Sequence, residues 1–156
     1  IHGDAGDVLG YGMRGGKVFV MGDVGYRSGI HMKAYQDKMP TIVVGGKAGD
    51  FLAEYMAGGV IAVLGMNVPA GDSATGEYVG TGMHGGTIYL RGKVDSHLLG
   101  REVGIAEPTP HDYSMLRLLL TEFCQHFPLQ PRSLFDRPFV KLTPLSSRPY
   151  GNLYCP

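Results

Sequence analysis

The chain has 156 residues, 44% of them hydrophobic, and its 14 basic side chains balance its 14 acidic ones. This length is typical of one domain, and the balanced charge argues against a general attraction to nucleic acid or to anionic lipid. No apolar run approaches the length of a membrane-spanning helix, and no signal peptide is visible. Cys124 and Cys155 form no C-x-x-C motif. We therefore expect a cytoplasmic protein with reduced thiols and no nucleic-acid or membrane partner.

Glycine is the unusual feature of the composition, because its 25 copies are more than twice its average use. The stretch GYGMRGG at residues 10–16 returns as GTGMHGG at residues 80–86, and similar landmarks recur between them. Their basic spacing is 19 residues, and two longer steps indicate insertions at residues 33–39 and 69–75. The landmarks of this structural repeat are Gly3, Gly6, Gly10, Met13, Gly15, Gly16, Gly22, Gly25, Gly29, Met32, Gly46, Gly49, Met56, Gly58, Gly59, Gly65, Met83, Gly85, Gly86 and Gly92.

Each repeat also carries a short alternating segment, at residues 18–20, 42–44, 61–63 and 88–90. Branched and aromatic residues at period two predict strands with one buried face. Units this short bury that face only by stacking, so we expect a mainly β fold, a single-stranded right-handed β-helix (solenoid) with coils of about 19 residues. Its inner stack would contain Val18, Val20, Ile42, Val44, Ile61, Val63, Ile88 and Leu90, with Met13, Met32, Met56 and Met83 along another inner corner.

Both copies of the glycine motif contain G-x-G-x-x-G, the spacing of a dinucleotide-binding turn. Such a turn leads directly into a helix whose N-terminus meets the pyrophosphate, whereas predicted strands follow Gly16 and Gly86 here. The six histidines show neither H-x-H nor H-E-x-x-H spacing, and no G-x-S-x-G motif is present. We therefore expect no catalytic, cofactor-binding or metal-ligating residue in the repeats.

Four aspartates stand beside repeat glycines and offer two interpretations. In turns, Asp bonds to nearby backbone, whereas glycine–aspartate repeats of another period bind calcium between coils. The spacing of 19 residues favours the structural role. The four aspartates are Asp4, Asp7, Asp23 and Asp50.

A different class of function, a stand-alone hydrolase with a pocket on the solenoid flank, would use His84, Arg14 or Asp7.

The middle residues of the predicted strands, Phe19, Val43, Ala62 and Tyr89, are apolar although they would face outward. Two interpretations remain open: the C-terminal segment of the same chain covers this stripe, or another subunit does. The chain also starts in the middle of a repeat, which indicates an earlier coil before Ile1. An open solenoid end exposes strand edges, so a homo-oligomer formed through that end is a further expectation.

The composition changes after the repeats, and we divide the chain into a repeat region, residues 1–105, and a C-terminal region, residues 106–156. The second region would pack on the solenoid or on a partner. Apolar residues at i, i+3 and i+4 predict an amphipathic helix over residues 111–127. Either Asp112 or Ser114 would cap its start.

The segment after this helix is rich in proline and aromatic residues. Pro128 would stop the helix, and residues 139–142 could add a strand. An extended tail of this kind has no room for a core of its own. We therefore expect it to dock on the repeats or on a neighbouring subunit.

The motif G-x-x-G-x-x-x-G-x-x-M-x-G-G spans residues 3–16 and returns in degenerate form at residues 46–59. It resembles the C-terminal GXGXG β-helix domain of the glutamate synthase large subunit. The ending FVKLTPLSSRPYGNLY, residues 139–154, is similar to the tail of the separately encoded, archaeal version of that domain. The repeat motif is shared with the C subunit of formylmethanofuran dehydrogenase and with a subunit of N-methylglutamate synthase.

The resemblance implies a noncatalytic scaffold in a glutamate synthase-like complex, which makes glutamate from 2-oxoglutarate with ammonia released from glutamine. Its partners would be a glutaminase part and a flavin and iron–sulfur part, and the latter would hold FMN and the cluster. This chain would bind no cofactor itself. The near alternative is the equivalent scaffold of a formylmethanofuran dehydrogenase, formyltransferase or N-methylglutamate synthase complex. The residues expected at a partner interface are Phe19, Val43, Tyr89, Arg148, Tyr150 and Tyr154.

Overall fold

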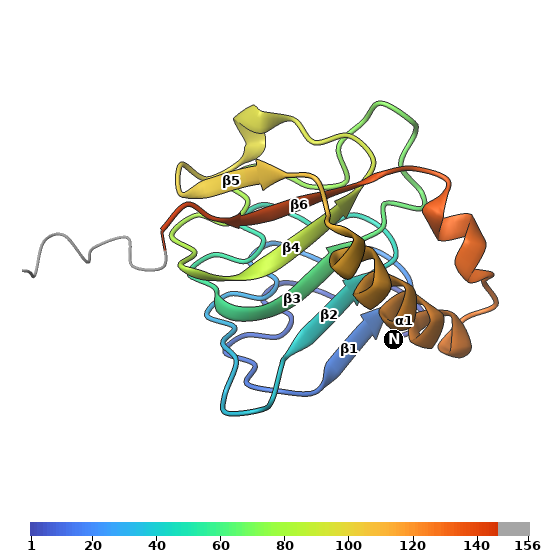
Figure 1. The fold of residues 1–156 in the computed structure, drawn as a ribbon, viewed down its shortest axis with the longest axis horizontal. Coiled ribbons are helices and arrows are strands. Elements are labelled where there is room, and N and C mark those ends of the chain that lie inside the picture. The colour runs from blue at the N-terminus through green and yellow to red at the C-terminus, as the bar shows by residue number, and fades with distance from the viewer. Residues whose placement is uncertain (147–156) are drawn as a thin grey trace, which may run out of the picture.

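The computed structural model describes residues 1–146, and it is mainly β with one α-helix (Figure 1). Six strands form one mixed sheet in the order β1-β2-β3-β4-β6-β5, so β1 and β5 are its edges and the sheet is not closed. Within residues 1–146, no helix has the length and apolar character needed to cross a membrane. The elements are β1 (Lys17–Val20), β2 (Thr41–Val44), β3 (Ala57–Val63), β4 (Gly85–Arg91), η1 (Ser96–Leu98), β5 (Val103–Ala106), α1 (Pro110–His126), η2 (Pro131–Phe135) and β6 (Phe139–Pro144).

Strands β1 to β4 pair in parallel with the register that the repeat predicts. Val18 pairs with Ile42, Ile42 with Ile61, and Ile61 with Ile88. Outside the strands the stacking continues, because isolated parallel bridges join equivalent residues of four repeats. Corresponding positions of successive repeats therefore lie side by side both in the sheet and beyond it. The bridged residues are Ala5, Val24, Ala48 and Thr75.

The two insertions form loops at the ends of the repeats. In the first, Tyr35 and Lys38 pair in a short antiparallel bridge. In the second, the Asp72 amide donates a hydrogen bond to the Pro69 carbonyl at 3.2 Å. The loops leave the strand register intact, which explains why the spacing changes along the sequence while the stacking does not.

One face of the parallel sheet packs against the turns of the repeats and forms the first hydrophobic core. The predicted inner residues of the strands lie in this core, and only Val18 among them is partly exposed. Met32, Met56 and Met83 are fully buried there, while Met13 packs at its end. Burying each such side chain contributes about 1.5–3 kcal/mol. The predicted inner stack and methionine corner are confirmed.

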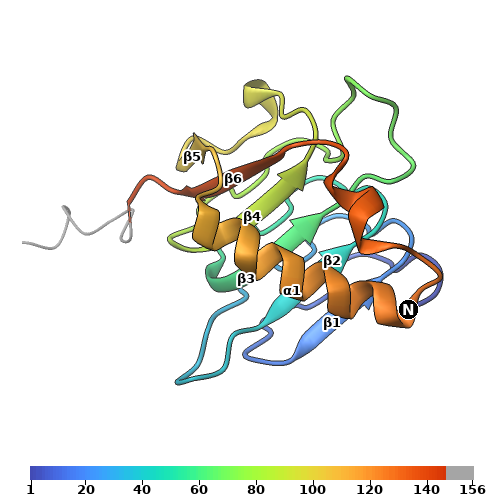
Figure 2. The same cartoon turned by 45° about the vertical axis from the view of Figure 1, so that its right-hand side comes forward.

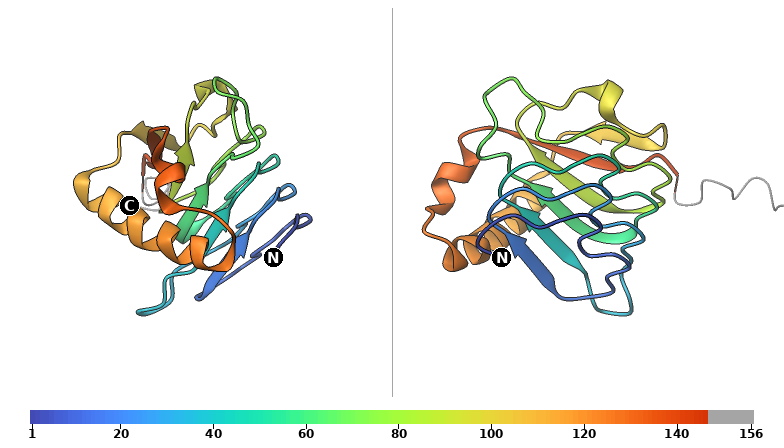
Figure 3. Two further views of the ribbon diagram at one scale, coloured as in Figure 1. Left: turned by 90° about the vertical axis from the view of Figure 1, so that its right-hand side faces the viewer. Right: turned by 180° about the vertical axis from the view of Figure 1, so that it is seen from behind.

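The other face of the sheet carries helix α1, which crosses the strands and forms the second core (Figure 2). Val43 and Ala62 are fully buried beneath it, and the ring of Phe19 meets the ring of Phe123 with 5.7 Å between their centroids. The helix and the turns thus lie on opposite sides of the sheet (Figure 3). Of the two interpretations of the apolar stripe, the structure shows cover by the chain's own helix.

The helix begins one residue earlier than predicted and has a different cap. Thr109 is the N-cap and accepts a hydrogen bond from the Asp112 amide, while the Asp112 carboxylate accepts one from the Thr109 amide. Neither Asp112 nor Ser114 is therefore the cap. Pro110 occupies the first helical position, where proline is favourable because no intrahelical partner needs its missing N–H. The helix ends at His126, two residues before Pro128.

The predicted C-terminal strand is present as β6, and it lies antiparallel between β4 and β5. This strand comes from the C-terminal region and extends the sheet that the repeats begin. Its Leu142 pairs with Ile88 of β4. Strand β5 has no counterpart among the predicted elements. It is only four residues long, and Val103 is its one buried side chain, so it lacks an alternating pattern.

Candidate functional site

The turns opposite α1 share an unusual backbone in which alternate residues have positive φ. In each of four repeats, three such residues occupy one turn segment: residues 8–12, 27–31, 51–55 and 78–82. Glycine tolerates this conformation, whereas other residues pay about 1–2 kcal/mol for it. The segments nonetheless contain seven non-glycine residues at these positions: Val8, Arg27, His31, Phe51, Ala53, Tyr55 and Tyr78.

The aspartates beside the glycines fasten each repeat to the next. The Asp4 carboxylate accepts a hydrogen bond from the Asp23 amide at 2.8 Å, and the Asp7 carboxylate accepts one from the Tyr26 amide at 3.0 Å. A glycine of the next repeat lies directly beneath each carboxylate, since a Cβ on Gly22 would stand 2.0 Å from Asp4 Oδ1. The same arrangement joins Asp7 to Gly25, Asp23 to Gly46 and Asp50 to Gly76.

These carboxylates therefore bond to the backbone of the following repeat. The sequence predicted a structural role, but with a bond to the backbone of the aspartate's own turn. Asp23 also accepts hydrogen bonds from Lys47 N at 2.7 Å and from Asn67 Nδ2 at 3.0 Å. Within residues 1–146, no three His, Cys, Asp or Glu side chains are grouped so as to hold a metal ion.

The glycine motifs of residues 10–16 and 80–86 are corners of the stack. Gly16 has φ +76° immediately before β1, and Gly86 has φ +86° inside β4. A strand, not a helix, follows each motif, as predicted. Strands β3 and β4 begin earlier than expected, because each includes its glycine pair.

The three side chains considered for a hydrolase are bonded to backbone, and no hydrogen bond described for residues 1–146 joins them. Arg14 Nη1 donates to the carbonyls of Gly12 at 2.7 Å and His31 at 2.8 Å. His84 Nδ1 lies 3.4 Å from the Gly82 carbonyl. Asp7 is occupied by the Tyr26 amide. This arrangement does not assemble an acid, base and nucleophile.

Two ladders of rings, the first with one guanidinium group, follow the outer side of the turn segments. In the first, the Arg27 guanidinium lies 5.2 Å from the Tyr26 ring and 5.1 Å from the Phe51 ring, which stacks on Tyr78 at 4.9 Å. Arg27 also donates to Glu54 at 2.8 Å, and this hydrogen bond raises the pKa of Arg27. Arginine is charged in any case, and this hydrogen bond holds its cation beside the two rings.

In the second ladder, the ring of His31 stacks on Tyr55 at 5.4 Å and meets the edge of Tyr11 at 6.1 Å. Tyr11 is 67% exposed, so this surface combines aromatic rings with access to solvent. We call the surface made by both ladders the aromatic turn face. It consists of Tyr11, Tyr26, Arg27, His31, Phe51, Tyr55 and Tyr78.

A buried polar cluster holds the start of α1 to the sheet. The Tyr89 hydroxyl donates to Asp112 at 2.6 Å, and Lys141 Nζ lies 3.0 Å from both carboxylate oxygens. Burial alone would raise the pKa of Asp112, but the hydrogen bonds from Tyr89, Thr109 and Lys141 lower it below its usual range. Burial, together with the Asp112 hydrogen bond, raises the pKa of Tyr89. Each polar group of the cluster has a partner, which is typical of a structural network.

The residues expected at a partner interface lie in different places in the structure. Val43 and Tyr89 are buried under α1 and are not accessible to a partner in this structure, while Phe19 is half-buried beside the same helix. Arg148, Tyr150 and Tyr154 lie outside the described residues. Exposed aromatic side chains gather instead on the aromatic turn face, which the sequence did not predict.

Cys124, the cysteine within residues 1–146, does not offer an activated thiol. Burial raises the pKa of the Cys124 thiol, so it stays protonated near neutral pH and is a poor nucleophile. Cys155 lies outside the described residues.

With this geometry established, comparison with known proteins places the chain in a family defined by its repeat. The chain matches the GXGXG motif family over residues 4–138 and belongs to it. This family is associated with glutamate synthase-like proteins. The uncharacterized protein MJ1350 of Methanocaldococcus jannaschii is 50% identical over 139 residues, which cover 86% of this chain and 53% of the relative. The chain thus spans about half the length of that curated relative.

Proposed function

We propose that this chain is a noncatalytic scaffold of a glutamate synthase-like complex, in which it braces a glutaminase part against a flavin and iron–sulfur part. The stacked repeats form a right-handed β-helix in this proposal, and its rigidity fixes the distance between the two partners. FMN and the iron–sulfur cluster belong to the partner, and this chain binds neither. Membership of the GXGXG motif family supports the assignment.

The polar side chains of the repeats support a scaffold role because they are used for stacking. Asp4, Asp7 and Asp50 each accept a backbone N–H of the next repeat. Arg14 likewise bonds to two turn carbonyls. These contacts stiffen the stack and leave the groups unavailable for acid–base chemistry.

The observation that carries the proposal is the aromatic turn face. Tyrosine and arginine are enriched at protein interfaces, because they combine large contact area with hydrogen-bonding capacity. Here Tyr11, Tyr26, Tyr55 and Tyr78 are each more than 40% exposed, on the side of the sheet that α1 does not cover. The rings of Tyr55 and Tyr78 stand at positive-φ positions, where glycine would be less strained. A binding function explains why rings are kept at such positions.

Co-purification from the native host tests both the function and the surface. The tagged chain should recover a glutaminase-type protein and a flavin and iron–sulfur protein, identified by mass spectrometry. The double variant His31→Gly, Tyr55→Gly should fold, because Gly12 and Gly82 occupy the equivalent positions of other repeats. It should recover at least about tenfold less of both partners, in line with the loss of two central ring contacts.

A matched control is Tyr35→Ser, which removes a tyrosine of similar exposure from the first inserted loop. It should leave recovery unchanged. If the unmodified chain recovers neither partner, or recovers the subunits of another enzyme complex, the functional assignment is wrong. If the double variant recovers both partners as well as the unmodified chain does, the aromatic turn face is not the docking surface.

A further inference from the structure

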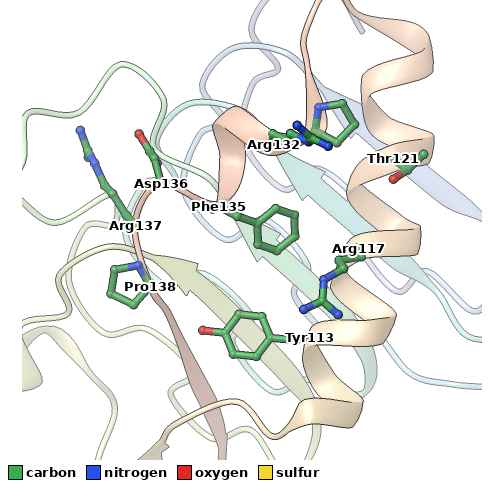
Figure 4. A pocket seen from close by; sticks show the side chains of 9 residues that line it. Tyr113, Arg117, Thr121, Arg132, Phe135, Asp136, Arg137 and Pro138 are labelled. Carbon is green, nitrogen blue, oxygen red and sulfur yellow. The ribbon is translucent and has the colours of Figure 1, made fainter.

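A cavity of about 630 Å³ opens on the side of the molecule that carries α1 (Figure 4). Helix α1 forms one wall, and η2 with the segment leading into β6 forms the other. This volume is within the range of small-molecule sites, about 300–1,000 Å³. The fully buried α1 side chains of the second core, Leu116, Leu120 and Phe123, are not among the residues that line the cavity.

Two cations with no bonding partner stand around this opening. Within residues 1–146, the side chains of Arg117 and Arg132 make no hydrogen bond or ion pair, and both are exposed. The carboxylate that lines the cavity, Asp136, already pairs with the buried Arg91. Arg137 donates to the Val68 carbonyl at 3.0 Å and points away from the rings (Figure 4). Among the described residues that line the opening, two guanidinium groups are therefore free, and the carboxylate of Asp136 is paired.

Two rings, held in place by other contacts, form the apolar part of the cavity. The Tyr113 hydroxyl accepts a hydrogen bond from the Phe139 amide at 3.4 Å, and the ring of Phe135 packs on Phe139 at 5.7 Å. Both rings are half-buried. In Figure 4 the Phe135 ring and the Arg117 guanidinium face each other from opposite walls, with the Tyr113 ring beside them. The opening therefore offers an aromatic surface and, across from it, a guanidinium group.

We propose that this cavity binds a small anion in which a planar ring is joined to a phosphate, the chemistry of a mononucleotide. The ring stacks on Phe135 and Tyr113, and the phosphate is held by the guanidinium groups of Arg117 and Arg132. Guanidinium forks match phosphate oxygens in bidentate geometry, and ring stacking on aromatic side chains contributes independently of base identity. The site lies on the opposite side of the sheet from the aromatic turn face, so it does not depend on the proposed scaffold role.

Isothermal titration calorimetry on the full chain tests the proposal with three probes: AMP, adenosine and inorganic phosphate. AMP should bind saturably and more tightly than either fragment, since it alone carries both ring and phosphate. Added salt should weaken AMP binding, because part of the affinity is electrostatic. No saturable binding of AMP at millimolar concentration, or equal binding of adenosine and AMP, would overturn the proposal.

Two substitutions locate the site, and a third serves as control. Arg117→Gln and Phe135→Leu should each weaken AMP binding at least about tenfold, through loss of the phosphate contact and of the stacking contact. Arg117 bonds to nothing else in residues 1–146, so its replacement should not disturb folding. Arg101→Gln, at an exposed arginine outside the cavity, should leave binding unchanged. If Arg117→Gln binds AMP like the unmodified chain, the anion is held elsewhere and the assignment fails.

Discussion

Single pairs of residues set the distance between successive repeats. The Asp4 carboxylate reaches down to the Asp23 amide at 2.8 Å, and its oxygen fills the space that a side chain on Gly22 would need. The backbone of Gly3 lies close to the same point, with its carbonyl oxygen 2.9 Å from the position of that Cβ. Glycine at this position is therefore required by close backbone approach and not by positive φ.

Gly22→Ala tests this requirement. The added methyl group would collide with backbone as well as with Asp4, so we expect a loss of about 1–3 kcal/mol in the free energy of unfolding, as in other overpacked sites. Gly6→Ala is the matched control, since a Cβ at Gly6 meets nothing within 4 Å and its φ is not positive. Chemical denaturation should show Gly6→Ala within about 0.5 kcal/mol of the unmodified chain. Equal stability of the two variants would contradict the close-approach argument.

For these residues, the sequence predicts which side chains are buried but not which residue each aspartate bonds to. The glycines, the methionines and the inner strand residues recur visibly, so their burial could be predicted. The partner of each aspartate could not, because the inserted loops at residues 33–39 and 69–75 make the distance from Asp to Gly differ between repeats. The aromatic ladders could not be predicted for another reason. Phe51 and Tyr55 have positive φ, and neither residue type indicates that conformation in a sequence.

At the scale of elements, helix α1 is attached to the sheet by its first turn as well as by its apolar face. Asp112 joins the two, because it completes the capping box with Thr109 and also accepts hydrogen bonds from Tyr89 of β4 and Lys141 of β6. The predicted helix and its buried residues follow from 3.6-residue periodicity. The N-cap of the helix and strand β5 could not be predicted in this way. The cap depends on Pro110 at the first helical position, and β5 has a single buried residue instead of an alternating pattern.

The Asp112 cluster makes stability depend on pH at its acid limit. The folded-state pKa of Asp112 is lowered, so its contribution is fully present above its unfolded pKa of about 4. It is lost as the pH falls below that value toward the folded-state pKa. Asp112→Asn should therefore cost about 1.5–3 kcal/mol at pH 7, the range for hydrogen bonds to a charged group.

Denaturation across a pH series measures this contribution. The difference in unfolding free energy between the unmodified chain and Asp112→Asn should be constant from pH 7 to about pH 5 and should shrink at lower pH. Asp136→Asn is a useful comparison, because its carboxylate is 57% exposed and its pair with Arg91 is less shielded from solvent. A difference that stays constant down to about pH 2 would show that the charge of Asp112 is not what fastens the helix.

Across the whole of the described part of the molecule, residues 1–146, a further strand pairs with one end of the parallel stack and no strand pairs with the other. Strand β6 pairs antiparallel with β4 and so covers the last parallel edge. At the other end, Ile1 bonds beside β1: its nitrogen donates to the Phe19 carbonyl at 2.8 Å and its carbonyl accepts from the Met21 amide at 2.9 Å. The two ends of the stack should therefore differ in stability, although their repeats are alike in sequence.

Hydrogen–deuterium exchange read by mass spectrometry measures that difference directly. Amides of β3 lie between two strands and under α1, so they should exchange only through global unfolding, whereas β1 opens locally and should exchange at least about 100-fold faster. A dilution series distinguishes an open edge from one covered by a second copy. Protection of β1 that falls on dilution would mean that copies of the chain associate through this edge, as unpaired strand edges tend to do. Protection of β1 equal to that of β3 at every concentration would contradict the stability gradient.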